Sequence, residues 1–156
     1  MAAKDDISKF AIDLEKQLKR SVSTNELKAL GAFVLDMVKA RVRKGFGVPS
    51  DGAAQEKLKP LSQAYKEQRK RLRLSPFTSP NKSNLTLSGG LIGGLKVTTR
   101  TGSVLIQPTG KTKRGLSRET LAEYVSKVRP FLHLSRSEIS KMTKFFEEKI
   151  LNKNIK

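Results

Sequence analysis

Apolar residues in the N-terminal part of the chain recur every three or four positions. Residues 4–20 carry one such series, which predicts an amphipathic helix. Its apolar positions are Ile7, Phe10, Leu14 and Leu18. A second series follows Ser23, where a capping-box pattern with Glu26 predicts the start of another helix that ends near Gly45. We therefore expect two helices before residue 45.

Glycine, proline and polar residues interrupt the pattern over residues 45–84. Gly45 begins a loop, and Pro60 keeps the residue before it extended. Ser62 can then cap a third helix, most of whose positions are basic. Residues 75–84 are rich in Pro, Ser, Asn and Thr, which is typical of a loop.

From Leu95 onward the apolar period changes to two. Residues 95–107 alternate on either side of Thr101 and Gly102, which predicts a β-hairpin. Ser117 predicts the start of a short helix, and a strand across residues 122–128 is an open alternative.

The last element has the clearest signal. Ser135 and Glu138 form a second capping-box pattern, and the apolar residues behind it share one helical face. These elements together predict an α+β fold: a small antiparallel sheet with a central hairpin, packed by two N-terminal helices and a C-terminal helix. A length of 156 residues with 37% hydrophobic content suits one domain. Its parts would be N-terminal helices over 1–44, a loop and basic helix over 45–84, a sheet region over 85–135 and a C-terminal helix over 136–152.

The charge of the chain is large and unevenly placed. The 32 Lys and Arg residues against 14 Asp and Glu give +18. Residues 1–36 hold six acids and six bases, so the whole excess lies in residues 37–156. Such a balance favours nucleic acid or acidic protein surfaces as partners. Cysteine is absent, which excludes disulfides and thiolate-bound metals. With neither a signal-peptide pattern nor a long apolar run, we expect a soluble, unexported protein that contacts no membrane.

Three features that resemble catalytic or nucleotide sites are weak. Gly110-Lys111-Thr112 resembles the end of a phosphate-binding loop, but Leu105 stands where that motif needs a glycine. The sequence Leu87-Ser88-Gly89-Gly90-Leu91 resembles an ATPase signature, yet it also describes a capped turn before a short apolar element. His133 is the one histidine, so no His pair can bind a metal. We therefore expect no catalytic residue, no cofactor, no metal and no small-molecule substrate, and hence no enzyme.

Two basic segments are candidate contacts for DNA or an acidic partner, with a solvated surface as the open alternative. The first lies on the predicted third helix, and the second lies in the loop after the hairpin. Their residues are Lys66, Arg69, Lys70, Arg71, Arg73, Lys111, Lys113 and Arg114.

Three junctions in residues 57–135 resemble, by their order, the virion morphogenesis (tail-completion) family of tailed bacteriophages, which includes neck, tail-terminator and head-tail connector proteins. The junctions are Pro60-Leu61-Ser62 before a basic helix, a Leu-Ser-Gly-x-Leu turn from residue 87, and Arg129-Pro130-Phe131-Leu132 before the last helix. The residues we expect to anchor the fold or the subunit contacts are Pro60, Leu61, Leu87, Gly89, Leu91, Arg129, Pro130 and Phe131.

The resemblance implies a structural virion protein that assembles as a ring, often of six copies, where tail meets head. Its partners would be other copies of itself, portal, adaptor or tail-tube proteins, and DNA in the lumen. It would be assembled in the cytoplasm of a bacterial host. The open alternatives are a monomeric basic nucleic-acid-binding protein associated with ribosome or nucleoid, and a small nucleotide hydrolase that uses residues 110–112.

Overall fold

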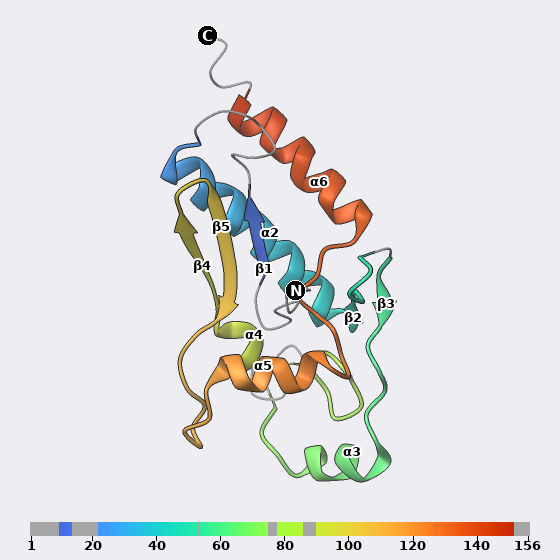
Figure 1. Cartoon of the computed structure of the whole chain (residues 1–156). Coiled ribbons are helices and arrows are strands. Elements are labelled where there is room, and N and C mark those ends of the chain that lie inside the picture. Colours follow the sequence, from blue (N-terminus) through green and yellow to red (C-terminus); the bar gives the residue numbers. More distant parts are fainter. Residues whose placement is uncertain (1–9, 14–21, 53, 75–77, 86–89, 152–156) are drawn as a thin grey trace, which may run out of the picture.

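The computed structural model describes residues 10–13, 22–52, 54–74, 78–85 and 90–151. The elements in chain order are β1 (Phe10–Asp13), α2 (Thr24–Arg43), β2 (Phe46–Gly47), β3 (Glu56–Lys57), α3 (Gln63–Lys70), α4 (Gly90–Gly93), β4 (Leu95–Arg100), β5 (Ser103–Pro108), α5 (Arg118–Ser126), α6 (Arg136–Phe146) and a π-helical turn (Glu147–Leu151). Figure 1 shows α2 along the sheet with α6 beside it, and α4, α5 and α3 toward the opposite end of the molecule.

A three-stranded antiparallel sheet in the order β1-β5-β4 forms the centre of the fold (Figure 1). β4 and β5 are the predicted hairpin, in which Thr98 faces Leu105 and Gly102 takes the turn with a φ of +69°. β5 lies in the middle, and its Val104 and Ile106 are buried. A second antiparallel sheet pairs β2 with β3. These helices and sheets confirm the predicted α+β class.

The N-terminal segment corrects the sequence-based prediction. Phe10–Asp13 form β1, which pairs antiparallel with β5, so the predicted helix over residues 4–20 is wrong there. The reason is that this edge of β5 carries backbone N–H and C=O groups that need partners. Pairing between distant segments leaves no local signature, and local helical spacing is only a weak guide against it. The rest of the predicted helix lies outside the described residues.

α2 supplies much of the hydrophobic core. The predicted capping box is confirmed: the Ser23 amide donates to Glu26 at 2.8 Å, and the Glu26 amide donates to the Ser23 hydroxyl at 3.2 Å. α2 lies so close to the sheet that a Cβ at Gly31 would come within 2.4 Å of Val97 Cγ1. The α2 side chains that face the core are Leu27, Leu30, Val34, Val38 and Val42.

α6 packs against α2 and covers the core beside it. Ser135 caps α6 and forms the predicted capping box with Glu138. The rings of Phe33 on α2 and Phe145 on α6 stack with their centroids 4.3 Å apart. The predicted C-terminal helix is confirmed, and it changes to a π-helical turn at Glu147.

The structure around α5 decides between the helix and the strand that the sequence left open. Arg118–Ser126 is a helix, so the alternative strand over 122–128 is wrong. Ser117 precedes α5, but within the described residues its side chain makes no capping hydrogen bond; its backbone forms a β-bridge with Lys111. α3 follows Ser62 as predicted, and the Tyr65 amide donates to the Ser62 hydroxyl.

Backbone contacts around β2 and β3 hold the segment after α2 against other parts of the chain. Gly47 lies so close to the segment before α6 that a Cβ there would meet the Pro130 carbonyl oxygen at 2.0 Å. The neighbouring Val48 amide donates to that same oxygen at 3.2 Å. The Leu58 amide donates to the Gly45 carbonyl at 2.8 Å. The segment around residue 58 is therefore tied to the end of α2, and the segment around residue 48 is tied to the approach to α6.

Candidate binding site

Described residues from each of the three junctions noted in the sequence line one cavity of about 330 Å³. Leu61 comes from the first junction, Gly90 and Leu91 from the second, and Arg129 from the third. Among the described residues, the lining is Leu61, Tyr65, Arg69, Ser83, Leu85, Gly90, Leu91, Leu121, Val125 and Arg129. The wall is thus mainly aliphatic, with two guanidinium groups, a phenol and a hydroxyl.

Arg129 ties the third junction to the first. Its Nε donates to the Lys59 carbonyl at 3.1 Å and to the Ser83 hydroxyl at 3.2 Å, and its Nη2 donates to the Pro60 carbonyl at 3.2 Å. Ser83 in turn donates to the Lys59 carbonyl at 2.7 Å. The guanidinium is therefore held in one orientation at the rim of the cavity, by acceptors that are all neutral.

Arg69 lies inside the protein, which corrects its expected place among the surface contacts. Its side chain leaves α3 and is only 2% exposed. Nη1 donates to the Lys82 carbonyl at 3.1 Å, while Nη2 donates to Thr78 Oγ1 at 2.9 Å and the Ser79 carbonyl at 3.1 Å. The loop from 78 to 82 thus wraps the guanidinium. Within the described residues, Arg69 Nε is buried and has no hydrogen-bond partner.

The other basic residues of the first segment differ in their surroundings. Lys70 lies 2.7 Å from the Glu67 carboxylate in an exposed ion pair, which contributes little to stability. Lys66 is half-buried, whereas Arg71 and Arg73 are exposed. The structure thus leaves only part of this segment free for an external partner.

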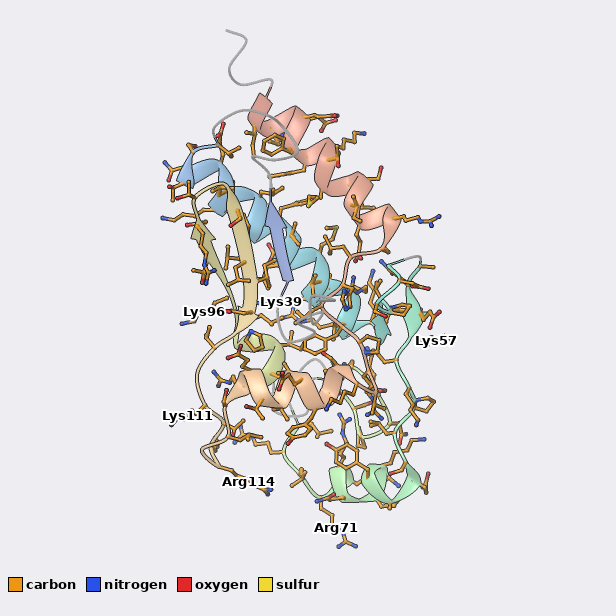
Figure 2. The ribbon with its side chains drawn as sticks, in the orientation of Figure 1. Lys39, Lys57, Arg71, Lys96, Lys111 and Arg114 are labelled. Atoms are coloured by element: carbon orange, nitrogen blue, oxygen red, sulfur yellow. The ribbon has the colours of Figure 1, made fainter. Side chains whose placement is uncertain are left out.

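The second basic segment forms a braced loop with exposed cations. The Gly115 amide donates to the Thr112 carbonyl at 2.9 Å, and the Thr112 amide donates to the Leu116 carbonyl at 2.8 Å. Arg118 Nη1 donates to the Thr109 carbonyl at 2.9 Å at the base of the loop. Figure 2 shows Lys111 and Arg114 projecting from this loop and Arg71 projecting at the same end of the molecule. The exposed loop cations are Lys111, Lys113 and Arg114.

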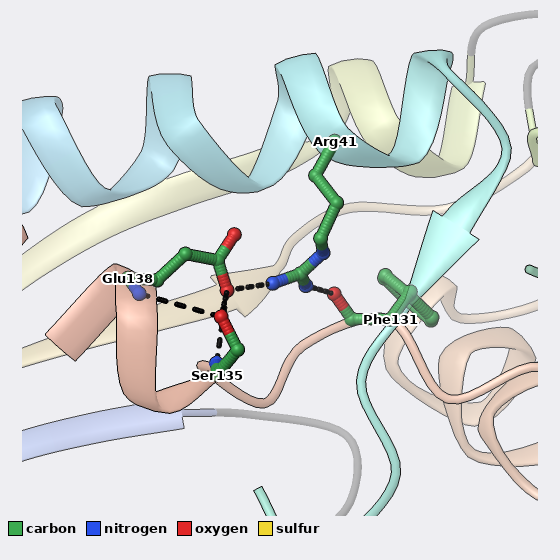
Figure 3. Close-up of polar contacts among 4 residues, drawn as sticks. All are labelled: Arg41, Phe131, Ser135 and Glu138. Carbon is green, nitrogen blue, oxygen red and sulfur yellow. Dashed lines mark hydrogen bonds and ion pairs between the residues drawn. The ribbon is translucent and has the colours of Figure 1, made fainter. Parts of the chain in front are cut away.

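A buried ion pair, which no pattern in the sequence had indicated, joins α2 to α6 (Figure 3). Arg41 Nη1 pairs with Glu138 Oε2, and both side chains are 2% exposed. Arg41 Nη2 donates to the Phe131 carbonyl, and the Ser135 amide and hydroxyl donate to Glu138 Oε2 at 2.9 and 3.1 Å. Burial lowers the pKa of the Arg41 guanidinium from its ordinary value, and the Glu138 carboxylate opposes that shift. The pair fixes the chain between Phe131 and α6.

The predicted anchor residues differ in how deeply they are buried. Phe131 is fully buried and Leu91 is 8% exposed. Pro60 is exposed, although its carbonyl accepts from Arg129. Leu61 and Pro130 are half-buried. Leu87 and Gly89 lie outside the described residues.

The structure gives no support to the phosphate-loop resemblance. A phosphate loop leads straight into a helix whose N-terminal amides face the phosphate. Here the chain after Lys111 makes the braced loop, and α5 begins only at Arg118. His133 is half-buried, and the Glu138 carboxylate is bound to Arg41 and Ser135. In the part of the chain that the structure describes, no three His, Asp or Glu residues gather as a metal site.

The described helices include none with the length and apolar character needed to cross a membrane. Comparison with models of known protein families, with curated proteins and with solved structures finds no match to this chain.

Proposed function

We propose that this protein is a structural subunit of a tailed bacteriophage, which assembles as a ring and joins tail to head as a neck or tail-completion protein. The observation that carries the proposal is that described residues from each of the three junctions behind the family resemblance come together in space. Leu61, Leu91 and Arg129 line the same cavity although they are far apart in sequence. Their order along the chain therefore corresponds to one structural unit and not to three unrelated turns.

In the proposed ring, several exposed large apolar side chains would be available for contacts between subunits. Tyr124 on α5 is 62% exposed, and Val128, which follows α5, is 48% exposed. The remaining exposed members are Leu72, Leu116 and Ile139. A ring subunit needs two faces that fit each other and no catalytic pocket.

The proposal is tested by the mass and shape of the assembled protein. Light scattering of the purified chain at increasing concentration, followed by electron microscopy, should give a closed ring of fixed subunit number, about six. As a matched pair, Val128→Glu places a charge on an exposed apolar side chain, whereas Thr98→Glu changes an exposed polar residue of β4. We expect the first substitution to weaken assembly and the second to leave it intact. A monomer at all concentrations, both alone and with virion components, would contradict the proposal.

A second candidate function, nucleic-acid binding by a monomer, is favoured by one specific observation. The loop cations Lys111, Lys113 and Arg114 are exposed, and the backbone bonds of the loop hold them together. Such a group can contact phosphates without reading bases. Stoichiometric RNA binding by a protein that never forms rings would favour this function over the first.

A further inference from the structure

The cavity at the three junctions combines aliphatic walls with two guanidinium groups that lack a counter-ion. Within the described residues, no carboxylate pairs with Arg69 or Arg129, and all of the acceptors that they contact are neutral. This matters most for Arg69, which is 2% exposed, because placing a charge in the protein interior without an opposite charge is costly. An anion that entered the cavity would recover part of that cost.

The two guanidinium groups are also held in place before any ligand arrives. Arg69 is fixed by three hydrogen bonds and lies 5.8 Å from the centroid of the Tyr65 ring, which also lines the cavity. Arg129 is fixed by three acceptors. Binding of a ligand would therefore cost little conformational entropy of these two side chains, which is the benefit of preorganisation.

The rest of the wall selects for an apolar group beside the anion. Its aliphatic side chains come from α4, α5 and the segments before α3 and α4, and they are Leu61, Leu85, Leu91, Leu121 and Val125. A volume of about 330 Å³ lies at the lower end of the range for ligand pockets, enough for a short segment and not for a large cofactor. The excess of 18 positive charges would draw acidic partners toward this surface.

We propose that this cavity binds a short acidic segment of a partner protein, by inserting one apolar side chain between α4 and α5 and placing the adjacent carboxylate against Arg69 and Arg129. The inference rests on the proposed function in that the occupant is a protein segment. The inference goes beyond the proposed function by assigning the binding site and the chemistry of the partner. The site combines an apolar anchor with a charge-assisted hydrogen bond, and the hydrogen bond supplies the specificity.

The test uses the full-length ¹⁵N-labelled protein and three synthetic peptides: acetyl-Gly-Leu-Glu-Gly-amide, the same peptide with Gln in place of Glu, and the same peptide with Ser in place of Leu. Titration to about 10 mM covers the weak affinity expected of so short a peptide. In ¹H–¹⁵N NMR spectra, the Leu-Glu peptide should change the amide chemical shifts of the cavity residues, and the change should saturate as peptide is added. Each control peptide should bind with an affinity at least about tenfold lower, because each lacks one of the two interactions.

A matched pair of variants locates the binding. Val125→Phe fills the cavity from α5, and we expect it to abolish the response to the Leu-Glu peptide. Glu123→Phe places the same ring on an exposed residue of the same helix outside the cavity and should retain the response. If Val125→Phe does not fold, the comparison of the three peptides on the unmodified protein still decides the matter.

Three outcomes would overturn the inference: no saturable shift with the Leu-Glu peptide, equal binding of the Leu-Gln peptide, or saturation of the same amides by a short DNA duplex in place of peptide. Failure here is distinguishable from failure of the proposed function. A protein that forms rings but does not bind the peptide refutes this site alone. A protein that binds the peptide but never forms rings refutes the ring and keeps the site.

Discussion

The ion pair between Arg41 and Glu138 gives the sharpest prediction about stability. Arg41→Met keeps much of the aliphatic volume but leaves the Glu138 carboxylate buried, where Ser135 is the one described residue that still donates to the oxygen that Arg41 had bound. Removing one partner of a buried pair costs about 3–5 kcal/mol. A domain of this size is stable by about 5–15 kcal/mol, so the loss should be a large fraction of the total.

The double variant separates charge from packing. In Arg41→Met/Glu138→Gln the buried carboxylate becomes a neutral amide, and its oxygen can still accept from the Ser135 amide as in a capping box. We therefore expect the double variant to be more stable than Arg41→Met alone, although it carries one more substitution. Such non-additivity is the signature of direct coupling.

The assay is urea unfolding followed by far-UV circular dichroism, with the slope m compared among variants. Lys28→Met is the control, because Lys28 is an exposed residue of the same helix. It should change the free energy of unfolding by no more than about 0.5 kcal/mol. The reasoning is refuted if Arg41→Met costs less than about 1 kcal/mol, or if the second substitution simply adds a further loss.

Three further predictions concern packing, the cavity rim and the basic loop. Gly47→Ala should destabilise by more than about 2 kcal/mol in thermal unfolding, because its Cβ would lie 2.0 Å from a carbonyl oxygen, whereas Gly93→Ala, with no atom within 4 Å, should be neutral or stabilising; equal effects would contradict this. Arg129→Ala should speed amide hydrogen exchange over residues 57–61, since it removes bonds to two carbonyls there, and unchanged protection would show that the arginine anchors nothing. Charge reversal of the three cations in loop 111–114 should weaken DNA binding and lower the slope of log K against log salt by about 0.9 for each phosphate that the loop no longer neutralises; an unchanged slope would remove the loop from any DNA interface.

The elements with local signatures could be predicted from the sequence. Ser23 and Ser135 each begin a capping box, and in both the decisive contact is made with the third residue beyond. The hairpin of β4 and β5 is local in the same sense, because Gly102 permits the tight turn between two alternating runs. The information for these elements lies within a few residues.

The features that depend on distant partners could not be predicted in this way. β1 exists because β5 offers it an edge, and their paired residues are far apart in sequence. Arg41 fits equally well as a cation at the end of a helix, and nothing in its neighbourhood announces Glu138 as its partner. Arg69 has the sequence surroundings of a surface charge, yet the loop that follows α3 encloses it. The cavity likewise depends on the meeting of three junctions that the sequence keeps apart.

The measurement that tests the proposed function most directly is electron microscopy of assembled phage particles in which this chain is labelled. We expect the label in a closed ring between head and tail, and particles without the chain should show heads and tails that fail to join. Detection of the protein only away from the particle, as a monomer bound to RNA, would contradict it.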